Sequence, residues 1–196
     1  MNFINIIIPL ILLFILLIYI KQQRTEVAWV TSKVDGRQYI VQNKKDKQIA
    51  ADKLALIRQN LVKLVEYCNQ NHPKDERVKR MQLKYDPDSI AEGTEDARYT
   101  SYTLNKGEKM VFCLRTRDYD DEIHDINLLL FVAIHELAHI MTISEGHTPE
   151  FNKNFQFLIQ EAVKSGIYQP VDYRVSPRKY CGIEVTDTPL GQEYFR

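Results

Sequence analysis

Two histidines and a glutamate on one short stretch are the residues of this chain best suited to chemistry. His135, Glu136 and His139 form the pattern H-E-x-x-H. On a helix, positions i and i+4 share one face, so the two imidazoles can bind one metal ion. Glu136 follows the first of them and can reach a water in an open coordination position. Three protein ligands and one water are the arrangement of catalytic zinc, so the pattern predicts metal-assisted hydrolysis with Glu136 as general base.

The element that must position these residues is predicted to be a buried helix. Residues 126–134 are apolar apart from Asn127, contain no Gly or Pro, and lead into an apolar run that continues to Ile143. A helix that is apolar on nearly all sides is buried. Polar groups inside such a helix are costly unless a partner satisfies them. The alternative, two hydrogen-bonded core histidines, fits a lone histidine better than a pair at i+4 that flanks a glutamate.

His147 is the third predicted ligand, eight residues after His139. Gly146 ends the preceding segment, Thr148 is suited to cap a new helix, and Pro149 is suited to its first position. Apolar residues then recur at helical spacing from 151 to 162, so this helix is expected to pack on the core. The segment therefore places His147 where it can face the metal. The alternative is a loop histidine in solvent.

Three segments of the chain resemble the WLM and SprT-like metallopeptidases. They are residues 114–117, 131–139 and 146–151, and the likeness extends over about residues 111–166. The shared pattern is H-E-x-x-H, a short variable spacer, Gly-His, and an aromatic residue a few positions later. The resemblance implies an α+β fold of the minimal zincin type, with a small antiparallel sheet beside the active-site helix.

The same resemblance implies roles for individual residues. His135, His139 and His147 match the zinc ligands, and Glu136 matches the general base. Some members of these families cut proteins crosslinked to DNA. This chain departs from them in having an apolar N-terminal segment and no DNA-binding zinc motif. The resemblance therefore implies peptidase activity more strongly than a role in DNA repair.

The N-terminus is predicted to be a membrane anchor formed by residues 1–21. Only Asn5, Pro9 and Tyr19 interrupt the aliphatic and Phe residues between positions 3 and 20, a length at the lower end for a spanning helix. A cleaved secretory signal is the alternative. Lys21 and Arg24 follow the segment, which predicts that residues 22–196, one zincin-like domain, face the cytoplasm.

Composition leaves the partners open. Residues 21–85 carry fifteen Lys and Arg against seven Asp and Glu, a net charge of +8, and residues 86–196 carry a balancing net charge of −8. The basic half fits anionic lipid, nucleic acid, or intramolecular pairing with the acidic half. Three widely spaced cysteines do not suggest a disulfide framework, and Cys113 is expected to be a small buried hydrophobe.

Periodicity predicts the remaining elements. A hairpin is expected from residues 27–31 and 38–41, a helix from 47 to 69, a loop from 86 to 98, and strands at 99–104 and 109–116. The second of these strands is a candidate for binding substrate backbone by strand addition. His72 and His124 are expected at the surface. The segment after residue 166 is irregular, and packing is the expected role of its tyrosines, with oxyanion stabilisation as the alternative; they are Tyr168, Tyr173 and Tyr180.

The sequence thus predicts a membrane-anchored zinc metalloprotease that hydrolyses peptide bonds of protein or peptide substrates. One alternative is a tethered zinc-binding interaction module that does not cut. The other is a protease that acts on DNA-associated proteins, although no motif supports nucleic acid as a partner.

Overall fold

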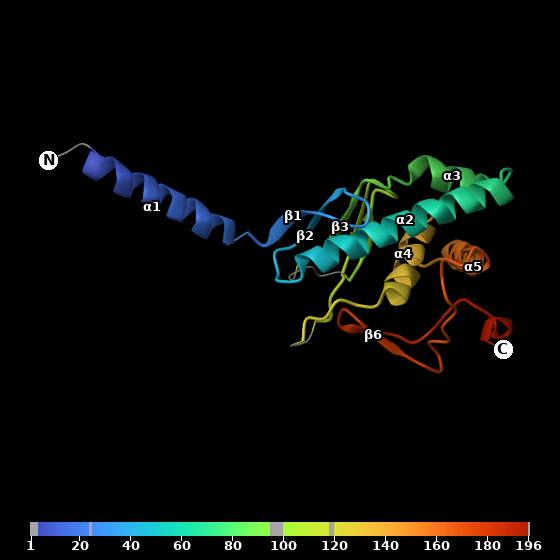
Figure 1. The fold of residues 1–196 in the computed structure, drawn as a ribbon. Coiled ribbons are helices and arrows are strands. Elements are labelled where there is room, and N and C mark those ends of the chain that lie inside the picture. The colour runs from blue at the N-terminus through green and yellow to red at the C-terminus, as the bar shows by residue number, and fades with distance from the viewer. Residues whose placement is uncertain (1–3, 24, 95–99, 118–119, 196) are drawn as a thin grey trace.

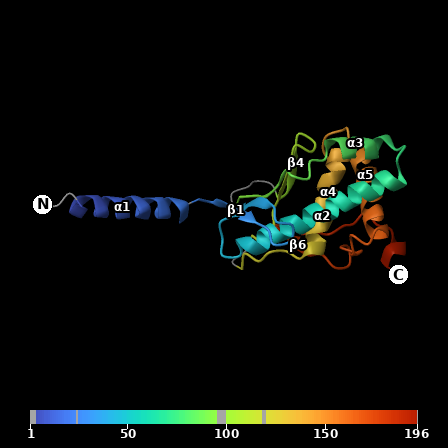
Figure 2. The ribbon, with the colours of Figure 1, turned by 45° about the horizontal axis from the view of Figure 1, so that its top comes forward.

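The computed structural model describes residues 4–23, 25–94, 100–117 and 120–195. A mixed α+β domain follows one N-terminal helix, α1 (Ile4–Gln23), that extends away from it in both views (Figures 1 and 2). Some of the positions used in the sequence predictions lie outside the described residues: residues 1–3 of the expected anchor, Arg24, residues 95–98 of the expected loop, and Tyr99 of the expected strand.

The described residues of the domain form three small β-sheets. The predicted hairpin is confirmed, because β1 (Val27–Thr31) pairs antiparallel with β2 (Gln38–Gln42). The second sheet has the order β3 (Ile90–Glu92), β5 (Lys109–Phe112), β4 (Tyr102–Leu104).

The prediction of an antiparallel sheet is wrong for one of these pairs. The four-residue turn between β4 and β5 makes them antiparallel, but β3 runs parallel to β5. The chain leaves β3, crosses to the far side of the sheet to form β4, and returns as β5 between the two. The expected loop at 86–98 therefore contains a strand, which is too short to be seen in an acidic stretch.

Four helices pack on one another and on these sheets. They are α2 (Lys47–Asn71), α3 (Glu76–Lys84), α4 (Ile126–Met141) and α5 (Pro149–Lys164). In Figures 1 and 2, α4 crosses α2, and α5 lies beside α4. The predicted caps are present for α5, since Thr148 accepts a hydrogen bond from Phe151 N–H and Pro149 is the first helical residue. Asp125 caps α4 by accepting from Leu128 N–H.

Helix α4 is the centre of the core, as its apolar sequence predicts. From Leu128 to Met141 every residue is buried except His135 and His139. Burial of such a run of Leu, Ile, Val and Phe supplies roughly 1.5–3 kcal/mol for each large side chain. Between Leu128 and Met141, only the two histidines are partly exposed.

The segment after α5 folds onto the domain. A short hairpin of β6 (Arg178–Tyr180) and β7 (Ile183–Val185) is followed by a 3-10 turn, η1 (Gln192–Phe195). The three tyrosines of this segment are buried, so their predicted packing role is confirmed; they are Tyr168, Tyr173 and Tyr180.

Cys113 is buried as expected, but the expectation that it is a free thiol is wrong. Cys113, just after β5, forms a disulfide with Cys181, in the turn between β6 and β7, and only Cys68 is a free thiol. The two half-cystines are 68 residues apart in sequence, so only the tertiary fold brings them together.

The predicted transmembrane anchor is not supported. Among the residues that the structure describes, no helix combines the length and the apolar character needed to cross a membrane.

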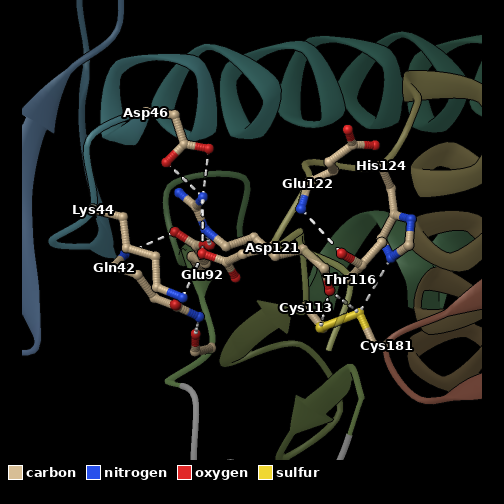
Figure 3. Close-up of polar contacts among 12 residues, drawn as sticks. Gln42, Lys44, Asp46, Glu92, Cys113, Thr116, Asp121, Glu122, His124 and Cys181 are labelled. Atoms are coloured by element: carbon tan, nitrogen blue, oxygen red, sulfur yellow. Dashed lines mark hydrogen bonds and ion pairs between the residues drawn. A yellow bond between two sulfur atoms is a disulfide. The ribbon is translucent and has the colours of Figure 1, made fainter. Parts of the chain in front are cut away.

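The opposite charges of the two halves of the chain are paired within the domain. Arg37 and Arg58 both contact Asp88, and Lys44 contacts Asp121. A buried network joins the halves again, because the Arg115 guanidinium bonds Glu92 on β3 and Asp46 at the start of α2 (Figure 3). These contacts support intramolecular pairing among the three interpretations of the charge pattern.

Candidate metal centre

Helix α4 presents His135 and His139 side by side. They occupy positions i and i+4, and their ring centroids are 5.0 Å apart. Burial lowers the pKa of His135 to about 3 and that of His139 to about 4, with further lowering from the neighbouring histidines. Both imidazoles are therefore neutral near pH 7, which is the form that binds a metal.

The loop after α4 brings His147 to the same place. Its Nε2 lies 3.0 Å from Nε2 of His135, and its ring centroid is 5.1 Å from that of His139. Gly146 precedes it with a φ of 76°, a left-handed conformation that glycine adopts without strain. The structure thus brings together all three histidines that the sequence singled out.

Two charged residues hold the loop that carries His147. The Lys106 ammonium donates to the carbonyls of Thr142, Ile143 and Ser144. Glu150, in the first turn of α5, accepts from the backbone N–H groups of Ile143 and Ser144. Those hydrogen bonds lower the pKa of Glu150 to about 2, so it stays ionised. The loop is therefore fixed from both sides, through its carbonyls and its amides.

Phe151 forms a floor beneath the three imidazoles. Its ring stacks on His139 at 4.3 Å, and it meets the edges of His135 and His147 at 4.8 Å each. The sequence indicated only that Phe151 packs on the core. Its place one turn into α5 puts it directly under the rings, where it limits their rotation.

The donor set fits zinc. A nitrogen atom from each of the three histidines lies within 4.8 Å of the others. Tetrahedral zinc with bonds of about 2.0–2.1 Å places neighbouring ligand nitrogens roughly 3.3 Å apart, close to the separation of the His135 and His147 nitrogens. Three imidazoles with a further position open to a cavity are a zinc ligand set of the catalytic kind.

Glu136 is buried beside this cluster and lines the same cavity. It is 5% exposed, and its carboxylate accepts a hydrogen bond of 2.9 Å from the Thr103 hydroxyl on β4. Burial raises the pKa of Glu136 to about 7, against the hydrogen bond, which lowers it. The sequence did not indicate Thr103, because its contact depends on how β4 packs against α4.

A cavity of about 600 Å³ opens above the three histidines. Its walls come from four parts of the chain: α4, β4 with the turn after it, the loop at 144–147, and the β6–β7 hairpin. The strand predicted to take up substrate backbone, 109–116, contains β5, which is paired on both sides. The edge strands of this sheet, among the described residues, are β3 and β4, and β4 lines the cavity.

The other candidates from the sequence are not part of the histidine cluster, although Tyr180 lines the same cavity. Tyr168 and Tyr173 are in the core with their hydroxyls facing each other, and the Tyr180 hydroxyl is engaged by Ser101 and the Cys113 carbonyl. His72 contacts Glu161 at 3.1 Å.

The surface position expected for His124 is wrong. It is 8% exposed, because its backbone N–H donates to the Leu114 carbonyl and its ring packs on Tyr180.

Comparison with known proteins finds relatives encoded by viruses. The chain is 34% identical to uncharacterized protein R325 of Acanthamoeba polyphaga mimivirus over 181 residues, which cover 87% of this chain and 88% of that protein. It is 39% identical over 84 residues to uncharacterized protein 042R of Invertebrate iridescent virus 3, covering 42% of this chain and 50% of that one. Uncharacterized protein 136R of Invertebrate iridescent virus 6 matches at 33% over 82 residues, 41% of this chain and 44% of that one.

No protein family model matches the chain. Among solved structures, Wss1 from Saccharomyces cerevisiae aligns with a TM-score of 0.49 and 20% identity, over 64% of this chain and 87% of that one. A likeness this remote carries no argument about function, whereas the mimivirus protein matches along nearly its whole length. This chain belongs to the protein family of uncharacterized protein R325 of Acanthamoeba polyphaga mimivirus.

Proposed function

We propose that the protein is a zinc-dependent metallopeptidase that hydrolyses peptide bonds in protein or peptide substrates. The observation that carries the proposal is the cluster of three histidine nitrogens within 4.8 Å of one another beside a buried glutamate, at the base of an open cavity. His135, His139 and His147 are the proposed zinc ligands, and Glu136 is the proposed general base.

The chain's own residues supply most of the proposed mechanism. When bound, zinc supplies a Lewis acid that acidifies water and polarises the scissile carbonyl. Glu136 accepts a proton from the attacking water and passes it to the leaving amine nitrogen. A carboxyl group whose pKa is about 7 can both accept and return a proton near neutral pH. Thr103 holds that carboxylate by its hydrogen bond. Strand β4, which lies at one edge of the described sheet and lines the cavity, is the proposed contact for the backbone of an extended substrate.

The test is a pair of substitutions in the full-length chain. Glu136→Gln should keep about one zinc per chain and lose cleavage of a protein substrate such as casein, since the amide cannot accept the proton. His147→Ala should lose zinc. Glu66→Gln, on the exposed face of α2, is the matched control and should behave like the parent. Cleavage by Glu136→Gln at the parental rate would exclude Glu136 as the base.

The same experiment separates the peptidase from a zinc-binding module that does not cut. A module would bind zinc through the same histidines and show no cleavage that depends on Glu136. We also propose a cytoplasmic location for the domain, because translocation of the basic residues that follow α1 across a membrane is unfavourable. Fractionation of cells that express the chain, with protease added to sealed vesicles, tests this location; a domain protected until detergent is added would contradict it.

A further inference from the structure

The disulfide between Cys113 and Cys181 ties the β6–β7 hairpin to the end of β5. We propose that this disulfide is a reversible redox latch, which reacts with dithiols and holds the hairpin as one wall of the catalytic cavity. The inference rests on the proposed function for its effect on cleavage, but its thiol chemistry stands apart from it.

The groups around the sulfur atoms suit thiol–disulfide exchange. Nε2 of His124 lies 3.7 Å from Sγ of Cys181, and the two residues face each other in Figure 3. Cys181 and His124 line a second cavity, of about 400 Å³, together with Arg117 and Lys179. A histidine and two cationic side chains favour the thiolate form of a cysteine, which is the reactive form, whereas Glu184 at the same cavity opposes it. Cys181 is 2% exposed, so the cavity is the route by which a small reductant reaches its sulfur.

The backbone at Cys181 supports a functional constraint. Cys181 has a φ of 49° and Gly182 a φ of 85°, so the two residues form a left-handed turn between paired Tyr180 and Ile183. Asn or Gly is preferred at the first position of such a turn. A cysteine there is disfavoured by its backbone, and such positions cluster at functional sites.

Reduction of the disulfide by a dithiol takes two thiol–disulfide exchange steps. The thiolate of a dithiol reductant attacks Sγ of Cys181, the bond to Cys113 breaks, and Cys113 leaves as a thiolate that takes a proton from water. The second thiolate of the reductant then displaces Cys181, whose sulfur takes a proton through His124. Two electrons pass to the protein, which gains two thiols, and the reductant becomes a disulfide. Reoxidation by an oxidised dithiol runs through the same steps in reverse.

The hairpin that the latch holds reaches the catalytic cavity. Tyr180, Ile183, Glu184 and Val185 all line the cavity opposite β4. The Tyr180 hydroxyl contacts the Ser101 hydroxyl at 2.6 Å and donates to the Cys113 carbonyl at 2.8 Å.

The hairpin depends on these attachments. Each of its strands has three residues, and a two-stranded hairpin of that size is marginally stable on its own. Loss of the disulfide therefore removes the covalent attachment of this wall and leaves the contacts of Tyr180 to hold it.

The experiment compares oxidised and dithiothreitol-reduced full-length protein in a zinc-buffered solution. Alkylation after denaturation should find one thiol, Cys68, in the oxidised protein and three in the reduced protein. Amide hydrogen exchange at residues 178–185 should accelerate on reduction, while that of α4 stays unchanged. For peptide cleavage, KM should rise by about threefold or more on reduction with kcat nearly constant, because the substrate loses a wall and the proposed base is untouched.

Two variants distinguish the effect of disulfide reduction from other effects of dithiothreitol, such as removal of zinc. The double variant Cys113→Ser/Cys181→Ser should behave as the reduced protein and ignore dithiothreitol, so any residual effect of the reagent reports zinc removal. His124→Gln should slow reduction by roughly tenfold without changing the end states, since it removes the proton donor to the leaving thiolate. His72→Gln, whose partner is Glu161, is the matched control and should be reduced at the parental rate.

Three results overturn the latch: three free thiols after incubation with an oxidised dithiol, equal exchange of the hairpin in both redox states, or an unchanged KM after verified reduction. Absence of cleavage in both states, with the thiol count and hydrogen exchange as expected, would instead overturn the proposed function and leave the thiol–disulfide exchange and the release of the hairpin standing.

Discussion

At the scale of single residues, Thr103 is the group whose removal tests how Glu136 is controlled. Its hydroxyl stabilises the Glu136 carboxylate, so Thr103→Val should raise a pKa that burial has already brought to about 7. A base must be deprotonated, so kcat/KM at pH 7 should fall by about three- to tenfold, and the acid limb of the pH–rate profile should move to higher pH. Thr103→Ser keeps the hydroxyl and should stay near the parent. An unshifted acid limb in Thr103→Val would contradict this role.

The two helix histidines predict acid sensitivity of the zinc-free protein. The folded pKa values of His135 and His139, about 3 and about 4, lie below the ordinary value of 6.5. The unfolded chain therefore binds more protons below pH 6.5, and the stability present above that pH is lost as pH falls toward 4 and then 3. Between pH 7.5 and 5, urea unfolding should show the parent losing roughly 1 kcal/mol more per histidine than His135→Gln/His139→Gln. Parallel profiles for the two proteins would contradict the depressed pKa values.

Spacing alone predicted that His135, His139 and His147 would meet, because i and i+4 on a helix and a pinned loop are local features. Their role as metal ligands stays a prediction. The roles of Thr103 and His124 could not be predicted from the sequence, because each residue acts through a contact between segments far apart in the chain. A pattern within one helix is visible in sequence, whereas a side chain delivered by another element is not.

At the scale of elements, the loop between α4 and α5 decides whether a third ligand is in place. Lys106→Met removes the ammonium that binds three carbonyls of this loop and keeps the apolar stem. Zinc affinity should fall by about 10-fold, the lower end of the effect of groups that orient metal ligands. Lys109→Met, which changes a lysine of the same β4–β5 hairpin, is the control. Competition with a chromophoric chelator measures the zinc affinity of both variants. Equal affinities would show that the loop keeps its position without Lys106.

The elements that periodicity predicted are the long ones. Helices α2, α4 and α5 each bury a continuous apolar stripe, so their spacing is visible in the sequence. The short helix α3 buries only Val78 and Met81, and β3 has three residues, so neither has enough apolar repeats to stand out. The disulfide could not be predicted either, because three cysteines allow several pairings and only the fold selects one.

At the scale of the whole molecule, α1 stands apart from the domain that carries the proposed site. Its described side chains, from Ile7 to Ile18, are all exposed and none belongs to the hydrophobic core. The core, the histidine cluster and the disulfide are built entirely from residues 39–190. Folding of the domain should therefore be independent of α1.

Removal of residues 1–25 tests this independence. The shortened chain should keep the same zinc content, the same disulfide and a melting temperature within a few degrees of the parent, because the described side chains of α1 are all exposed. It should also aggregate less, since a long run of exposed Ile and Leu is removed. Thermal unfolding, elemental analysis and light scattering measure these three properties. A fall of about 10 °C or more in the melting temperature would correspond to a decrease of more than about 1–2 kcal/mol in the free energy of unfolding. Such a decrease would show that α1 packs on the domain in solution.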